Sequence, residues 1–523
     1  MIFWVKRQRW ITNLGIDLSK NLNALYTCCI ETPWLDVSEK LYDELNIIPS
    51  YFIGWDDGSI KIQEKYKDCF FQVIEDAWEG NGFPDLDYEY PIDEKLLKSI
   101  SFEQNIAIKM MDRLDLDRYS FNFSDRQSFF FYLLKKWLVI LDKYEIDIII
   151  SPSIPHRVFD YILYIAAKLK NIEFIMFQMT PFFDSSFIID DIDTTTKYLK
   201  DTIQKQDKLF HIREDIKIRI EQVTREYSGA IPDYMKAQSQ MLKNNNVLNK
   251  LAKRIRTLVS KPNILFEKNT TYHVSQDSMP YEDKEPKYRF LLKKYKNKIF
   301  LKNLQDSYNS IVTNDYKNKY VFVALHYQPE ETSTPTGGSF TEQELIINLL
   351  DSFLDKDIDI VVKEHKTQFH PNYEGATGRS SSFYKNILKN SNRVKFVSVE
   401  SDPFKLIDNA IATVTISGTI GWESVIRGTP TLVFGRAWYE DMIGVYKIKS
   451  IEDLRKNWLS IQEDKNNIKN EDIYAYHAKL QEFFIDAPHY KAFQNKSNRS
   501  KEENIDNIFN GIKNHLVRKE ILN

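Results

Sequence analysis

The chain has 523 residues, 42% of them hydrophobic and 14% aromatic, which is enough to bury two large cores, so we expect two domains. A net charge of −3 excludes the global basic field that favours nucleic-acid binding. Three cysteines, Cys28, Cys29 and Cys69, exclude a disulfide framework and favour a reducing cytoplasm.

Residues 1–189 are predicted to form an N-terminal α/β domain. Ile2–Val5 is predicted to be its first strand, because the basic residues follow this apolar run and a secretory signal has them before it. A buried strand at Ile146–His156 ends in a proline-rich turn, a helix follows at Arg157–Lys170, and the next strand lies at Asn171–Phe182. This order forms a βαβ unit and predicts a parallel sheet.

Residues 190–318 are predicted to be a mostly helical insertion. They are rich in lysine and asparagine but keep apolar residues at helical spacing, at Ile212–Tyr227, Pro232–Ser260 and Pro286–Ser310. No apolar run reaches membrane-spanning length. Basic and apolar residues at Lys250–Lys261 leave two interpretations open, a solvated helix face and peripheral association with the inner face of the cytoplasmic membrane.

Residues 319–470 are predicted to form a second α/β domain, because strands and helices alternate along them. The polar, helical residues 471–523 are expected to pack back on the N-terminal domain. The predicted elements of the second domain are strands at Tyr320–Glu330, Ile358–His365, Ile411–Ser417 and Thr431–Phe434, and helices at Glu342–Leu354 and Phe404–Ala410.

The segment Ala412–Tyr439 carries the strongest functional signal. An apolar strand runs into a turn made of Ser417, Gly418 and Thr419, and a helix begins near Ile420. Free N–H groups at a helix N-terminus bind phosphate well, so this turn is predicted to hold the phosphate of a nucleotide. The alternative is an ordinary βαβ unit whose turn binds nothing.

Two further residues of this segment are assigned to the same nucleotide site. Gly421, like Gly418, allows a phosphate to approach the backbone closely. Glu423 follows early in the helix and is predicted to bond a ribose hydroxyl. Ligands of open α/β sheets bind beyond the carboxyl ends of the strands, which is where these residues lie.

Polar residues also follow two other predicted strands of the second domain. A carboxylate can take a proton from an acceptor hydroxyl, and a cation can offset phosphate charge, so these residues suit sugar transfer. The alternative interpretations are that Glu330 and Glu331 are acids of a surface turn and that His365 is a structural histidine. No metal site is predicted. The residues are Gln328, Glu330 and Glu331, with a flexible Thr336–Ser339 loop, and Lys363, Glu364 and His365.

Three motifs, in the order in which they occur along the chain, resemble those of the capsule polysaccharide biosynthesis family, which includes Kdo transferases. The motifs are QPEETSTPTGGSF, VVKEH and TISGTIGWESVIRGTPTLVFGRAWY, and Lys366 stands where the family usually has proline. The resemblance implies a GT-B-like α/β fold, with two Rossmann-like domains facing a central cleft. The residues of this chain that match the family pattern are Gln328, Pro329 and Glu330 in the first motif, Lys363, Glu364 and His365 in the second, and Ser417, Gly418, Thr419, Gly421 and Glu423 in the third.

The resemblance implies a metal-independent glycosyltransferase with no cofactor beyond its nucleotide-sugar donor. The donor is expected to be CMP-Kdo or a related CMP-ulosonic acid, and the acceptor a surface or capsular glycan or glycolipid. Glu330 is expected to be the principal catalytic carboxylate, and Glu364 and His365 to position the donor. Two alternatives stay open: a transferase of polyol phosphate from a CDP-alcohol, and a non-catalytic glycan-binding or export-assembly protein.

Overall fold

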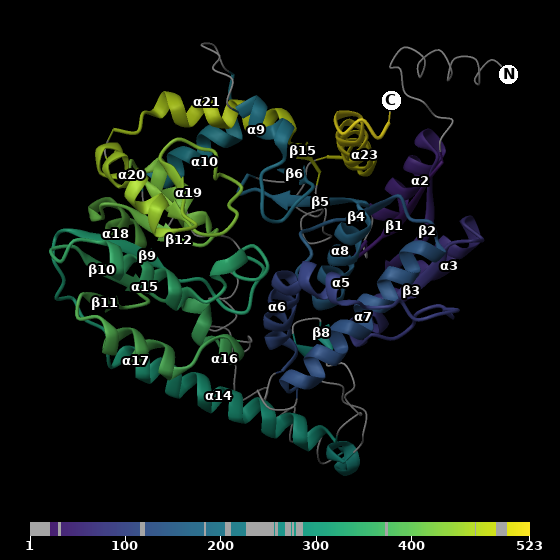
Figure 1. Cartoon of the computed structure of the whole chain (residues 1–523), viewed down its shortest axis with the longest axis horizontal. Helices are drawn as coiled ribbons and strands as arrows, with labels where there is room; N and C mark the ends of the chain where they lie inside the picture. Colours follow the sequence, from purple (N-terminus) through teal and green to yellow (C-terminus); the bar gives the residue numbers. More distant parts are fainter. Residues whose placement is uncertain are drawn as a thin grey trace. The chain divides into compact units, whose positions relative to one another are not determined.

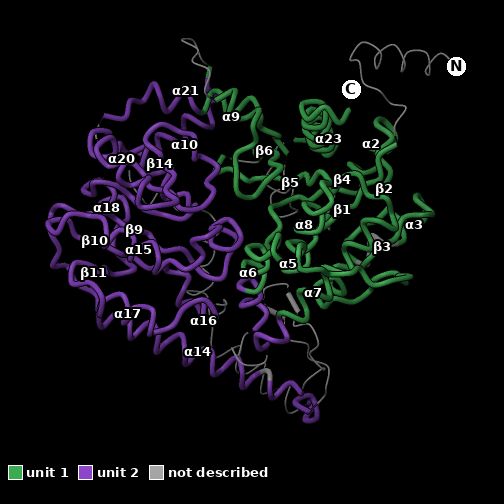
Figure 2. Tube along the Cα trace, viewed as in Figure 1, with its two compact units in different colours: residues 1–108, 127–211, 477–523 green, residues 109–126, 212–476 purple. Residues whose placement is uncertain are grey.

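The chain divides into two units, each described here by itself (Figure 2). Unit 1 comprises residues 1–108, 127–211 and 477–523, and unit 2 comprises residues 109–126 and 212–476. The computed structural model describes residues 21–29, 33–115, 121–182, 185–203, 211–225, 256, 260–266, 273–274, 277–278, 286–371, 375–465, 467–487 and 499–522.

Two predicted segments fall outside the described residues. The strand predicted at Ile2–Val5 is one, and most of the helix predicted at Pro232–Ser260 is the other. Most of the basic segment Lys250–Lys261 lies outside them as well.

Unit 1 is built on a seven-stranded sheet in the order β15-β6-β5-β4-β1-β2-β3. The strands β3, β2, β1, β4 and β5 are parallel, whereas β6 and β15 run antiparallel at one edge. The strands are β1 (Leu22–Tyr26), β2 (Ile47–Gly54), β3 (Phe70–Val73), β4 (Ile148–Ser151), β5 (Glu173–Met179), β6 (Ser185–Ile189) and β15 (Ile485–Asp486).

Helices pack on this sheet and close its core (Figure 1). The last helix, α23, packs against α2, and its residues Ile508 and Ile512 are buried in the same core as strand β1. The helices are α2 (Trp34–Leu45), α3 (Asp56–Lys65), α4 (Ile74–Glu79), α5 (Glu94–Ser99), α6 (Ser101–Met110), α7 (Phe123–Lys143), α8 (Val158–Lys170), α9 (Lys197–Ile203), η5 (Gln481–Phe483) and α23 (Lys501–Arg518).

Unit 2 is built on a six-stranded, fully parallel sheet in the order β11-β10-β9-β12-β13-β14. Its central strands are buried along nearly their whole length, because helices cover both faces of a parallel sheet. The strands are β9 (Tyr320–Ala324), β10 (Asp359–Lys363), β11 (Val394–Val397), β12 (Thr413–Thr415), β13 (Thr431–Val433) and β14 (Val445–Lys447), and β7 (His273–Val274) and β8 (Asp277–Ser278) form a separate hairpin.

Residues 109–126 lie in unit 2, although their neighbours in sequence on both sides lie in unit 1. They contain η1, which packs against α16 of the same unit. The helices of unit 2 are η1 (Met111–Leu114), α10 (Glu214–Arg225), η2 (Pro262–Leu265), α14 (Lys287–Asn309), η3 (Gly338–Phe340), α15 (Gln343–Phe353), η4 (Lys366–Phe369), α16 (Gly375–Gly378), α17 (Ser381–Asn390), α18 (Pro403–Asn409), α19 (Thr419–Ile426), α20 (Ile451–Asp464) and α21 (Asn470–Leu480), the last of which continues into unit 1.

Both units share one strand order. In chain order, each sheet runs third, second, first, fourth and fifth strand, which is the order of the Rossmann fold. The predicted fold class, α/β with two Rossmann-like domains as in GT-B proteins, is therefore confirmed, while the central cleft stays a prediction. Within the described ranges, no helix is both long and apolar enough to cross a bilayer.

Candidate functional site

The carboxyl ends of β9 and β12 lie side by side in the middle of the unit 2 sheet. The strand order reverses between these two strands, and open α/β sheets bind ligands in the crevice beyond such a point. Every site residue predicted from the sequence ends or follows β9, β10 or β12, so all of them belong to this one edge of the sheet.

The turn after β12 leaves two amide groups without acceptors. Gly418 precedes the first turn of α19, and the N–H groups of Thr419 and Ile420 meet no hydrogen-bond acceptor among the described residues. The Tyr439 hydroxyl fixes the turn by donating to the Gly418 carbonyl oxygen at 2.5 Å. Two free amides at a helix N-terminus are the donors that a phosphate group prefers.

The two glycines of this turn differ in their surroundings. A Cβ atom on Gly418 would lie 3.1 Å from the His326 ring and from Thr415 Oγ1, which is tight. A Cβ atom on Gly421 would lie only 2.2 Å from the Tyr439 hydroxyl. Gly421 is therefore required by packing against Tyr439, and its predicted contact with phosphate stays a prediction.

Glu423 lies on the same helix with its carboxyl group buried. Its side chain is only 6% exposed, and no described residue donates a hydrogen bond to it. Burial raises its pKa to about 8, although Arg219 and Arg427 oppose the rise. A buried carboxyl without a donor is costly unless a ligand completes it, so Glu423 is a candidate for bonding a ligand hydroxyl.

His326, which the motif analysis did not single out, joins β9 to the turn after β12. Its Nε2 atom lies 2.7 Å from Thr415 Oγ1 and accepts the Ile416 N–H at 3.1 Å. Its own backbone N–H donates to Gln343 at 2.7 Å. Burial lowers its pKa to about 3, so the ring is neutral and acts as a fixed acceptor.

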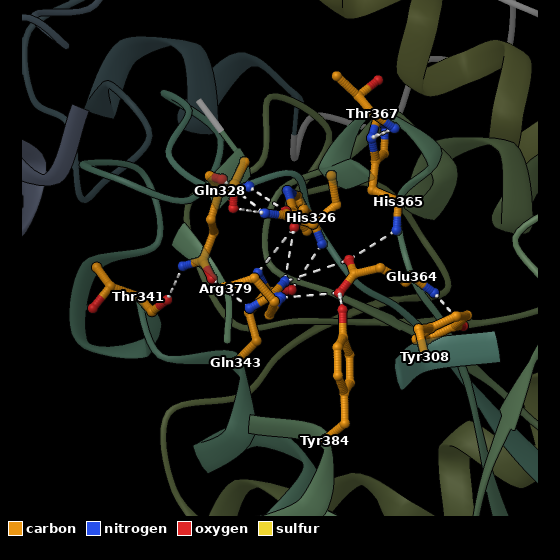
Figure 3. A network of polar contacts seen from close by, with 12 residues as sticks. Tyr308, His326, Gln328, Thr341, Gln343, Glu364, His365, Thr367, Arg379 and Tyr384 are labelled. Carbon is orange, nitrogen blue, oxygen red and sulfur yellow. Dashed lines mark hydrogen bonds and ion pairs between the residues drawn. The ribbon is translucent and has the colours of Figure 1, made fainter. Parts of the chain in front are cut away.

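Glu364 lies at the centre of a buried polar network (Figure 3). Arg379 Nε donates to its carboxylate at 2.9 Å, the Tyr384 hydroxyl at 2.7 Å, and the His365 N–H at 2.9 Å. Its backbone N–H donates to the Tyr308 hydroxyl at 3.0 Å. The carboxylate is fully enclosed, so this geometry favours a positioning role, and the catalytic role predicted for Glu364 stays a prediction.

Gln328 belongs to the same network. Its side-chain oxygen accepts from Arg379 Nη1 at 2.6 Å, and its amide nitrogen donates to the Thr341 carbonyl at 2.5 Å. Its backbone N–H donates to Gln368 at 2.9 Å. Both ends of the Gln328 side chain are thus engaged within the protein, and the predicted contact with the nucleotide stays a prediction.

Lys363 and His365 are the partly exposed groups at the end of β10. Burial is the main cause that lowers the Lys363 pKa to about 8 and the His365 pKa to about 4. His365 Nδ1 accepts the Thr367 N–H at 3.2 Å, so the neutral ring carries its proton on Nε2. Nε2 has no acceptor among the described residues, which makes it a hydrogen-bond donor for a ligand.

An acidic pair, Glu330 and Glu331, follows the strand β9. Glu330 is exposed and accepts a hydrogen bond from Thr332 Oγ1 at 3.0 Å. Burial raises the pKa of Glu331 to about 7, the Glu330 carboxylate adds to the rise, and Arg113 and Arg436 oppose it. Neither arginine was predicted as a site residue from the sequence, and both are buried.

The loop after the acidic pair is compact. The sequence predicted a flexible Thr336–Ser339 loop, but Ser333 and Thr336 are buried. The Ser417 hydroxyl donates to the Thr332 carbonyl at 2.8 Å and lies 3.3 Å from Thr336 Oγ1. The loop is therefore packed onto the turn Ser417–Thr419, because its short hydroxyl side chains bond the backbone.

Comparisons with known proteins identify similar structures at low identity. A UDP-GlcNAc 2-epimerase from Methanocaldococcus jannaschii is 13% identical, with 88% of this chain and 98% of that chain covered and a TM-score of 0.25. The beta Kdo 2,7 transferase KpsC from Thermosulfurimonas dismutans is 11% identical, with 71% and 87% covered and a TM-score of 0.27. A glycosyltransferase from Rickettsia africae is 12% identical, with 89% and 94% covered and a TM-score of 0.23.

No curated protein matches this chain. Residues 275–485 match the family of capsule polysaccharide biosynthesis proteins. The match spans the strands β9 to β14 and every site residue predicted from the sequence. The resemblance to this family is therefore confirmed over these residues.

Proposed function

We propose that this protein is a metal-independent glycosyltransferase of capsule polysaccharide biosynthesis. The observation that carries the proposal is the pair of free amides on Thr419 and Ile420, with the buried Glu423 carboxyl on the same helix. A phosphate-binding helix end and a hydroxyl-binding carboxyl are what a nucleotide requires. They lie within the segment that matches the capsule family.

The donor we propose is CMP-linked Kdo or a related ulosonic acid, as the family resemblance implies. The phosphate of CMP would lie at the N-terminus of α19, with Lys363 and His365 as further donors to the departing phosphate. Lys363 and the N-terminus of α19 supply positive charge without a divalent cation, and the neutral His365 ring supplies an N–H donor. No cofactor is needed beyond this donor.

The acidic pair would carry the proton transfer. In the reaction the bond between the sugar and the CMP phosphate breaks, and the acceptor hydroxyl oxygen forms the new glycosidic bond. The hydroxyl proton passes to a carboxylate, and CMP leaves. The sequence favours Glu330 for this role, and the pKa of about 7 at Glu331 makes Glu331 the stronger candidate, because a general base works best near the working pH.

The buried network around Glu364 would position these groups. Arg379 connects Glu364 to Gln328 and to the His326 carbonyl, and His326 holds the turn before α19. A rigid frame of this kind keeps the donor in one geometry. The acceptor we propose is a surface or capsular glycan or glycolipid, met at the cytoplasmic side of the membrane.

Calorimetric titration with CMP, CDP, UDP and GDP tests the donor class. We expect CMP to bind and the variant Gly418→Val to lose at least tenfold in affinity, while Ser339→Val on the exposed end of the neighbouring loop keeps it. Release of CMP from CMP-Kdo by the purified protein then tests transfer. Preference for CDP would favour a polyol-phosphate transferase, and binding without any turnover would favour a non-catalytic glycan-binding protein.

A further inference from the structure

A stripe of large apolar side chains lies exposed along α14 of unit 2. Tyr288, Leu291, Leu292, Tyr295 and Ile299 are between 36% and 63% exposed. At about 100° per residue, they fall within an arc of about 100° on one face of the helix. Phe266, itself 69% exposed, lies 5.8 Å from Tyr288, ring centre to ring centre, and extends this apolar surface.

The same helix is anchored to unit 2 through its other end and its opposite face. Leu301, Leu304 and Tyr308 are buried in the core, and the Tyr308 hydroxyl donates to the Val397 carbonyl at 2.6 Å. These anchors lie about 160° around the helix from the centre of the stripe. The stripe therefore points away from the core of unit 2, along whose lower edge α14 runs in Figure 1.

All charged residues in the exposed part of α14 are basic. From Lys287 to Lys302 the helix contains seven basic residues and no acidic one, although the whole chain has a net charge of −3. Four of them flank the apolar stripe, Lys287 and Lys298 on one side and Arg289 and Lys296 on the other, at positions from which long side chains reach polar groups beside an apolar surface. The others are Lys293, Lys294 and Lys302, of which Lys302 falls within the arc of the stripe.

The first part of the helix leaves the apolar stripe largely exposed. None of its described side chains before Leu301 is buried, although the helix contacts η2 near its start. The combination of an apolar stripe with flanking lysines is the pattern of helices that lie in the plane of a membrane surface.

We propose that α14 docks this protein on an anionic phospholipid surface, with the stripe Tyr288–Ile299 in the acyl-chain boundary and the lysines at the headgroups. A soluble polyanion would attract the lysines but leave the apolar stripe in water. A second copy of the chain would bring seven further positive charges against the first seven, which disfavours pairing through this face. The proposal rests on α14 alone and does not depend on the proposed function.

Sedimentation with sucrose-loaded vesicles tests this assignment on the full chain. The vesicles are pure phosphatidylcholine or phosphatidylcholine with about one-third phosphatidylglycerol. The stripe variant is Leu292→Gln with Tyr295→Gln, and the charge variant is Lys296→Gln with Lys298→Gln. The matched control is Leu345→Gln with Leu459→Gln, which removes two leucines that are 51% and 67% exposed elsewhere on unit 2.

We expect wild type and control to bind the anionic vesicles, and binding to fall with added salt and without phosphatidylglycerol. The stripe variant should lose more than tenfold in partitioning, and the charge variant at least fivefold. Thermal unfolding midpoints check that all variants are folded.

Three results would overturn the proposal. They are absence of wild-type binding to the anionic vesicles, a stripe variant that binds as well as the control, and loss in the charge variant alone. Should the stripe variant instead turn a dimer into a monomer in vesicle-free sedimentation, with no effect on lipid binding, the face is a contact between copies.

Discussion

The ring of His326 lies 2.7 Å from the hydroxyl of Thr415, measured from Nε2 to Oγ1. This contact ties the end of β9 to the end of β12, where the strand order of the sheet reverses. On its other side, the His326 carbonyl accepts from Arg379 of the buried network. One neutral histidine thus connects the turn before α19 to the Glu364 network.

The first prediction concerns the pH dependence of His326. Its folded pKa of about 3 lies below the usual 6.5, so its contribution to stability is full above about pH 6.5 and is lost as the pH falls toward 3. His326→Gln keeps an acceptor but removes this titration. We expect the wild-type thermal midpoint to fall more steeply between pH 6.5 and 4 than that of the variant. Parallel curves would show that the ring is not neutral and buried in solution.

The second prediction separates structure from catalysis at Glu364. Glu364→Gln leaves Arg379 buried without its ion-pair partner, and the loss of one partner of a buried pair costs about 3–5 kcal/mol. Urea denaturation should show a large destabilisation, which Arg379→Met in the same chain partly restores. A Glu364→Gln protein of unchanged stability that has lost turnover would instead assign Glu364 a catalytic role.

The third prediction compares the two acids after β9. Replacing a general base commonly costs about 10²–10⁴-fold in rate, so Glu331→Gln should lower turnover by this factor with little change in CMP affinity. The pH–rate profile of wild type should have a limb near pH 7 that the variant lacks. If Glu330→Gln shows the loss and Glu331→Gln does not, proton transfer belongs to Glu330, as the sequence suggested.

The fourth prediction concerns Arg113, which lowers the pKa of Glu331. Arg113→Leu removes this positive charge, so the limb of the pH–rate profile near pH 7 should shift upward. Lys109→Met is the control, because Lys109 lies close by in the sequence but pairs with Glu342 at 2.9 Å. A limb that stays in place in Arg113→Leu would remove Arg113 from the surroundings of Glu331.

The sequence predicted the fold of both units because strand and helix periods differ clearly in elements such as α8 and β10. It also predicted that the polar residues after β9, β10 and β12 share an edge, since parallel strands end on the same side. The sequence could not predict which of these residues make their hydrogen bonds within the protein instead of with a ligand. Glu364 and Gln328 look like site residues by position, but their partner Arg379 carries no pattern of its own.

The sequence also did not reveal three other features of the candidate site. Arg113 belongs to a segment of the N-terminal half that lies in unit 2, and no local pattern links it to Glu331. The compact loop after Glu331 was also missed, because threonine, serine and glycine are typical of flexible loops as well as of tightly bonded turns. His326 was visible at the end of a strand, and a neutral role for it follows only from its burial.

Hydrogen–deuterium exchange of the full chain with saturating CMP tests the central claim most directly. The account predicts slower exchange for the amides at the start of α19, from Thr419 to Glu423, because the phosphate accepts from Thr419 and Ile420. The Gly418→Val variant should lose this protection. Unchanged exchange at the start of α19 in wild type, at a CMP concentration that calorimetry shows to be saturating, would contradict the account.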